Sequence, residues 1–95
     1  MTIQHEQQEQ RGHFFIPDGD ELAAEMTYIR HDPKTIIIDH TEVSAELQGQ
    51  NIGYQLVQAA VEYAREHGLK ILPVCSFAAA IFRKKPELRD VLKEE

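Results

Sequence analysis

The sequence predicts a compact α/β (α+β) domain with a mixed, mostly antiparallel sheet in the order β-β-β-α-β-α. Turn residues separate three strand-like segments before residue 44, and a stripe of apolar residues at helical spacing follows. A short apolar segment then leads into a second helix. With 95 residues, 42% of them apolar, the chain is long enough for one small domain and too short for two.

The start of the chain differs in composition from the rest. Residues 1–10 contain four Gln and two Glu, and too few apolar side chains to offset the entropy cost of ordering. We therefore expect a disordered tail over residues 1–10 and a single domain over residues 11–95.

The cluster Pro17-Asp18-Gly19-Asp20 predicts the turn of a β-hairpin with strands at about 13–16 and 21–30. The second of these strands carries apolar side chains at alternating positions, namely Leu22, Ala24, Met26 and Tyr28. A helix is the competing interpretation of this segment, because Ala, Glu, Leu and Met all favour helices.

Residues 31–34 predict a second turn, and residues 35–43 form a β-branched segment. Both alternating sets of this segment contain apolar residues. That pattern is typical of a central strand covered on both faces.

The clearest helix runs over residues 52–68, where apolar side chains recur at helical spacing up to Gly68, a residue suited to closing a helix. Residues 69–74 predict a short strand, so that strand, helix and strand form a right-handed crossover. A second helix is expected over residues 76–84 with Ser76 as its N-cap, and a polar terminal helix over residues 87–95.

The charge balance narrows the classes of partner. Sixteen Asp and Glu against ten Lys and Arg give a net charge of −6, which repels nucleic acid and is compatible with an amine. One cysteine and no basic, apolar leader indicate a reducing cytoplasm, and no apolar run is long enough to cross a membrane. An open edge strand is compatible with a monomer or a weak homodimer.

The segment Glu46–Gly53 joins the third strand to the main helix and is the strongest chemical signal. A glycine-containing loop at a helix N-terminus presents unpaired N–H groups and a positive dipole end, which bind phosphate without basic side chains. A strand-to-helix turn that needs glycine only for its geometry is the alternative interpretation.

The segment Gln48–Gly53 resembles the Q/R-x-x-G-x-G/A signature of the GNAT N-acetyltransferase superfamily, with Asn51 in place of the first Gly. Asn tolerates left-handed backbone geometry better than other non-glycine residues, so the loop can keep its shape. Together with the segments 40–43 and 73–77, the chain resembles the YjdJ-type family of minimal GNAT-like acetyltransferases over about residues 11–88.

This resemblance implies a slot for acetyl-CoA between two diverging strands. Val43 or its neighbour is implied as the backbone donor to the thioester carbonyl. Pro73 suits the divergence independently, because it has no N–H to give to a sheet. The residues implied to bind the cofactor are Val43, Gln48, Gly49, Gln50, Asn51, Ile52 and Gly53.

The resemblance also points to Cys75 as a catalytic residue that accepts the acetyl group or protonates the departing coenzyme A thiolate. A buried, inert thiol is the alternative. His40 is the candidate base, with Glu42 on the same strand face as a second possibility, whereas we expect Asp39 to point to the other face.

Other polar and aromatic residues are given structural roles. We expect Phe77 and Phe82 to pack in the core, and residues 83–85 to complement the helix end rather than bind a phosphate. The remaining histidines show no spacing typical of a metal site.

The function expected from the resemblance is acetyl transfer from acetyl-CoA to an unidentified amine. The alternative is a non-enzymatic module that senses coenzyme A or mediates a protein contact on a reduced GNAT core.

Overall fold

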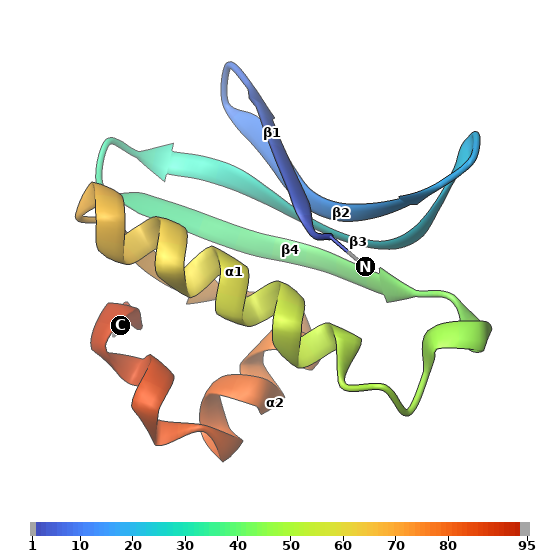
Figure 1. Cartoon of the computed structure of the whole chain (residues 1–95). Coiled ribbons are helices and arrows are strands. Elements are labelled where there is room, and N and C mark those ends of the chain that lie inside the picture. The colour runs from blue at the N-terminus through green and yellow to red at the C-terminus, as the bar shows by residue number, and fades with distance from the viewer. Residues whose placement is uncertain (1, 94–95) are drawn as a thin grey trace.

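The computed structural model describes residues 2–93 as one five-stranded sheet with the strand order β1-β2-β3-β4-β5 and two α-helices (Figure 1). Strands β1 to β4 pair antiparallel, and β4 pairs parallel with β5. The predicted fold class and the order of elements from residue 11 onward are therefore confirmed. The elements are β1 (Gln4–Gln8), β2 (Arg11–Asp18), β3 (Glu21–Asp32), β4 (Thr35–Val43), η1 (Ala45–Leu47), α1 (Ile52–His67), β5 (Lys70–Pro73), α2 (Ser76–Lys84) and η2 (Pro86–Val91), where η denotes a 3-10 helix.

Helix α1 packs across one face of the sheet and supplies much of the core. Its buried stripe faces Ala24, Met26 and Tyr28 of β3, which confirms the alternation predicted for that strand except at Leu22, which is 43% exposed. Gly68 has a φ of 65° and closes α1 as expected. The buried residues of α1 are Ile52, Gly53, Leu56, Val57, Ala60, Val61 and Ala64.

The C-terminal segment contributes apolar side chains to the core, although its composition is mostly polar. A polar helix was expected over residues 87–95, of which residues 94–95 lie outside the described residues. In the described part the structure has η2 instead, which buries Leu88 and Val91 in the core. Leu92 also bridges to Ile71, and this contact lies along the outer edge of β5.

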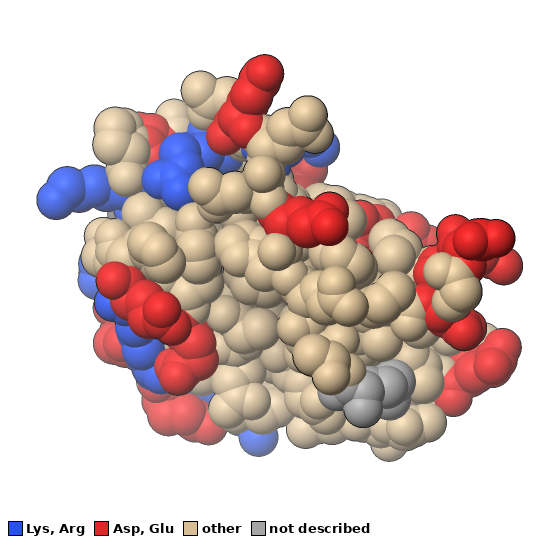
Figure 2. Space-filling view, turned by 45° about the horizontal axis from the view of Figure 1, so that its top comes forward, with Lys and Arg blue, Asp and Glu red and all other residues tan. Residues whose placement is uncertain are grey.

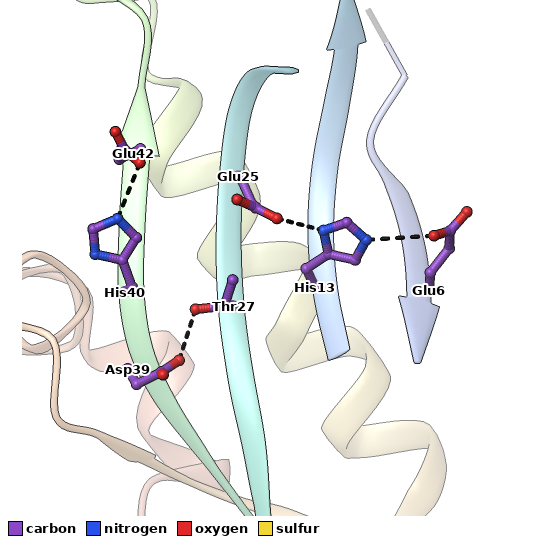
Figure 3. Close-up of polar contacts among 7 residues, drawn as sticks. All are labelled: Glu6, His13, Glu25, Thr27, Asp39, His40 and Glu42. Carbon is purple, nitrogen blue, oxygen red and sulfur yellow. Dashed lines mark hydrogen bonds and ion pairs between the residues drawn. The ribbon is translucent and has the colours of Figure 1, made fainter. Parts of the chain in front are cut away.

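Figure 3 views the other face of the sheet, with α1 behind the strands. His40 and Glu42 of β4 are exposed there, whereas Ile36 and Ile38 on the helix-covered face are fully buried. The expectation that residues 35–43 are covered on both faces is therefore wrong. In β4, the side chains on both faces are apolar only in the first half of the strand.

The prediction of a disordered tail over residues 1–10 is wrong for β1. Backbone pairing with β2 needs no apolar side chains, and Ile3 packs against the core. His5 adds specific contacts, because its ring stacks on Phe14 at 4.1 Å and its Nε2 lies 2.6 Å from the Tyr28 hydroxyl. A composition count misses both kinds of stabilisation.

His5 is expected to make stability depend on pH. Burial, and then the nearby His13 and His67, lower the pKa of His5 below its ordinary 6.5, so the folded state favours the neutral ring. The unfolded chain binds this proton more readily, so the stabilisation is present above about pH 6.5 and is lost as the pH falls below it. Urea unfolding of the native protein and of His5→Phe, which keeps the ring stack without titrating, should show a larger acid loss for the native protein. Identical pH profiles would contradict this role.

No helix among residues 2–93 combines the length and apolar character that a membrane crossing requires.

Candidate functional site

Strands β4 and β5 separate at Pro73. Their parallel pairing ends with Ile38 opposite Pro73, and the N–H groups of Val74 and Cys75 both donate to the Ile38 carbonyl at 3.0 Å. The position expected for Pro73, where pairing stops, is confirmed. Beyond this point β4 continues without β5 beside it, which opens a gap along its edge.

Two backbone N–H groups of β4 point into that gap. Ser44 donates its N–H to Ala23 of β3 at 2.8 Å, and alternate residues of an antiparallel strand direct their N–H groups to opposite sides. The N–H groups of Thr41 and Val43 therefore point away from β3, toward the side that β5 has left.

The loop before α1 has the backbone geometry of an anion site. Asn51 adopts a left-handed φ of 63° as expected, Gly49 has a φ of 86°, and the Asn51 side chain makes no capping bond. The first helical bond runs from Gln55 N–H to the Asn51 carbonyl at 3.2 Å. Within residues 2–93, the backbone N–H groups of Ile52, Gly53 and Tyr54 have no acceptor. They are therefore free to bind an anion.

These elements surround a cleft of about 690 Å³. It contains every residue that the sequence assigned to cofactor binding except Gln50, whose Nε2 donates to the Glu46 carbonyl at 3.3 Å instead. Cys75 and His40 are not among its lining residues. The cleft is lined by Thr41, Glu42, Val43, Leu47, Gln48, Gly49, Asn51, Ile52, Gly53, Tyr54, Phe77 and Ile81.

The aromatic and aliphatic walls of the cleft were not predicted. Phe77 was expected in the core, but its side chain is 43% exposed, whereas Phe82 is 2% exposed and does lie in the core. The Phe77 ring rests on Gly53, where a Cβ atom would clash with it. Phe77 and Ile81 are four residues apart and thus share a helix face, which is the signal that could have identified this wall.

Cys75 lies beside the cleft as the N-cap of α2, a position that the sequence assigned to Ser76. Its Sγ is 3.5 Å from Oγ1 of Thr41, a residue that lines the cleft. Burial raises the pKa of the Cys75 thiol, but the Thr41 hydroxyl and the N–H groups of Ala78, Phe77 and Thr41 together outweigh burial and lower it. These contacts favour the thiolate form of Cys75 more than in a free cysteine.

Replacing Thr41 by valine should make Cys75 less reactive. The substitution keeps the branched shape and removes the hydroxyl that stabilises the thiolate, so the thiol pKa rises. We expect alkylation by iodoacetamide near neutral pH to slow several-fold, with the pH profile displaced upward. Thr41→Ser keeps the hydroxyl and should react like the native protein. Equal profiles for the valine and serine variants would exclude this role of the hydroxyl.

His40 is not brought to Cys75. It lies on the open face, where its Nε2 is 3.1 Å from Oε2 of Glu42, as Figure 3 shows. Neighbouring strand residues point to opposite faces, so His40 faces away from Thr41 and from the thiol beside it. Because a carboxylate only accepts hydrogen bonds, Nε2 is the donor in this contact.

Asp39 was expected on the opposite face from His40, and this expectation is wrong. The register between β3 and β4 shifts at this point, since Tyr28 pairs with Ile38 and Thr27 with His40. Asp39 is the extra residue of the resulting bulge, and it accepts a bond of 2.7 Å from the Thr27 hydroxyl on the open face (Figure 3). Its role there is structural.

Further polar contacts lie on the open face. His13 lies between Glu25 at 2.6 Å and Glu6 at 3.4 Å (Figure 3). In the part of the chain that the structure describes, no three His, Cys, Asp or Glu side chains are arranged to hold a metal ion. On the face in Figure 2, acidic side chains lie mostly toward the margins and basic ones are fewer.

Comparisons with known proteins agree with this geometry. The sequence model described as GCN5-related N-acetyl-transferase matches residues 13–91. A GCN5-like protein from Staphylococcus aureus, solved by NMR, is 40% identical with a TM-score of 0.74, covering 97% of this chain and 89% of its own. No match is found among curated proteins.

Two larger structures share the fold. An IAA acetyltransferase from Bacillus cereus is 23% identical with a TM-score of 0.62, covering 80% of this chain and 54% of its own. The ribosomal-protein-S18-alanine N-acetyltransferase from Escherichia coli is 16% identical with a TM-score of 0.66, covering 82% and 53% respectively. This chain therefore spans about half the length of these two proteins.

Proposed function

Because the chain belongs to the family of GCN5-related N-acetyltransferases, we propose that it binds acetyl-CoA in the cleft between β4 and α1 and transfers the acetyl group to an amine. The observation that carries this proposal is the set of unpaired N–H groups at the start of α1, opening on the gap where β5 leaves β4. Acetyl-CoA supplies the acetyl group as an activated thioester.

The loop residues fit a diphosphate. Backbone N–H groups and the helix dipole bind it without basic side chains, so the net charge of −6 is no obstacle. Asn51 holds the left-handed conformation that the signature assigns to glycine, and its uncapped side chain adds a donor. The residues proposed to hold the cofactor are Val43, Gln48, Gly49, Gln50, Asn51, Ile52 and Gly53.

The N–H group of Val43 is proposed to bind the thioester carbonyl oxygen, since the N–H of Thr41 already faces the Cys75 sulfur. The Val43 N–H points into the gap from a rigid strand, and a fixed donor of this kind stabilises the negative charge that develops on a carbonyl oxygen during acyl transfer.

Cys75 is the proposed acetyl acceptor. The donors around its sulfur stabilise a thiolate, which suits a nucleophile better than a proton donor. The Cys75 thiolate takes the acetyl group and coenzyme A leaves as its thiolate. A neutral amine then takes the acetyl group, gives up one proton and releases the Cys75 thiolate.

His40 is the proposed base for the amine. Glu42, with its Oε2 3.1 Å from Nε2 of His40, orients the ring. Since His40 faces the open side, the acceptor would approach over the end of β4. We propose a small-molecule or peptide amine in the cytoplasm as this acceptor, and assign the chain to the YjdJ-type minimal branch of the family.

The experiment combines calorimetry with intact-mass measurement. Titration with acetyl-CoA should show binding, and incubation should add the mass of one acetyl group to the native protein but not to Cys75→Ala. Thr41→Ser serves as the matched control because it keeps the thiol environment. Absence of acetyl-CoA binding would refute the proposal as a whole, and equal turnover by Cys75→Ala with a panel of amines would refute the role of the thiol.

A further inference from the structure

A basic side chain, Lys85, lies next to Tyr54 in the wall of the cleft. Phe77 and Ile81 line the cleft from α2, and Lys85 follows at the same spacing of four residues. The N–H of Lys85 donates to the Ile81 carbonyl at 3.0 Å, so the helical course continues to this residue. The three side chains therefore form one stripe, whose last member is a cation.

The ammonium group of Lys85 is held by an aromatic ring. Its Nζ lies 5.0 Å from the centroid of the Tyr54 ring, and Tyr54 lines the cleft directly after Gly53. None of the ion pairs found among residues 2–93 includes Lys85. An ammonium placed over a ring keeps its N–H donors for an anion, whereas a paired carboxylate would use one of them and offset the positive charge.

The surroundings make this cation distinctive. The lining of the cleft includes one acidic residue, Glu42, and no Lys, Arg or His, in a chain of net charge −6. The N–H groups at the start of α1 can bind one anionic group of a ligand. Lys85 can bind a second anionic group of the same ligand. A ligand with two separate anionic groups fits this arrangement.

We propose that Lys85 binds the 3′-phosphate of the coenzyme A ribose and makes the cleft selective for coenzyme A over its 3′-dephospho form. This inference rests on the proposed function. In coenzyme A the 3′-phosphate is separated from the diphosphate by one ribose, and Tyr54 follows directly on the loop assigned to the diphosphate. Lys85 thus acts as a phosphate-recognition residue and not only as a charge that complements the end of α2.

Calorimetric titration with coenzyme A and with 3′-dephospho-coenzyme A tests the inference. We expect the native protein to bind coenzyme A about tenfold more tightly, and the preference to weaken with added salt. Lys85→Met keeps the aliphatic stem that packs near Tyr54 and should bind both ligands equally. Lys84→Met removes a neighbouring charge outside the stripe and should keep the preference.

The outcomes separate the two proposals. A native protein that binds both ligands equally, or a Lys85→Met variant that keeps the preference, would overturn the inference and leave the proposed function intact. A native protein that binds neither ligand would overturn both. Circular dichroism of each variant establishes that it is folded before the affinities are compared.

Discussion

Replacing Gly12 by alanine is expected to destabilise the protein by about 3 kcal/mol, the upper end of the range for an overpacked site. Gly12 of β2 lies directly opposite Tyr28 of β3, and the Tyr28 ring crosses over it. A Cβ atom at residue 12 would fall inside contact distance of Cζ and the hydroxyl of that ring. The ring has nowhere to move, because Tyr28 is 2% exposed and its hydroxyl is bound by His5 at 2.6 Å.

Urea unfolding followed by circular dichroism measures this effect, and a double-mutant cycle with Tyr28→Leu assigns its cause. If the clash is responsible, Gly12→Ala should cost much less in the Tyr28→Leu background than in the native protein. Arg11→Ala, an exposed neighbour on the same strand, controls for a general effect of alanine in β2 and should change stability little. Additive losses in the cycle would rule out this explanation.

The parts of the fold that the sequence predicts are those in which the pattern of apolar side chains decides the structure. The stripe over residues 52–68 specifies α1, and Pro73 marks the end of the parallel pairing, because neither depends on distant contacts. Strand β1 could not be predicted in the same way. It is held by backbone pairing and by the contacts of His5 with Phe14 and Tyr28, which composition does not show.

The candidate site shows a similar division. The loop over residues 48–53 was identified because glycine and asparagine mark left-handed backbone in the sequence itself. The predicted positions of Asp39 and Phe77 were wrong because both depend on tertiary structure. A bulge in β4 changes which face Asp39 occupies, and the separation of β4 from β5 leaves Phe77 at the wall of a cleft rather than in the core.

Replacing Gly53 by alanine should abolish most acetyl-CoA binding while leaving the protein folded. The family signature admits alanine here and alanine keeps the N–H donor, so neither backbone conformation nor a lost hydrogen bond accounts for the effect. The added Cβ would clash with the far end of the Phe77 ring. Because Phe77 is 43% exposed on the wall of the cleft, its ring can move aside. The ring would then occupy part of the cleft in which acetyl-CoA is proposed to bind. We expect affinity to fall at least tenfold, or about 1.4 kcal/mol in binding free energy.

The contrast with Gly12→Ala makes this prediction specific. Both substitutions place a methyl group against an aromatic ring, but the Tyr28 ring is buried and bound by a hydrogen bond, whereas the Phe77 ring borders an open cleft. Calorimetry should therefore show lost binding for Gly53→Ala, whereas urea unfolding should show a much smaller loss of stability than for Gly12→Ala. In a Phe77→Ala background, Gly53→Ala should have little further effect on affinity, since the ring that transmits the clash is gone. Native affinity in the single variant, or an undiminished loss in the Phe77→Ala background, would show that the ring does not link Gly53 to the cleft.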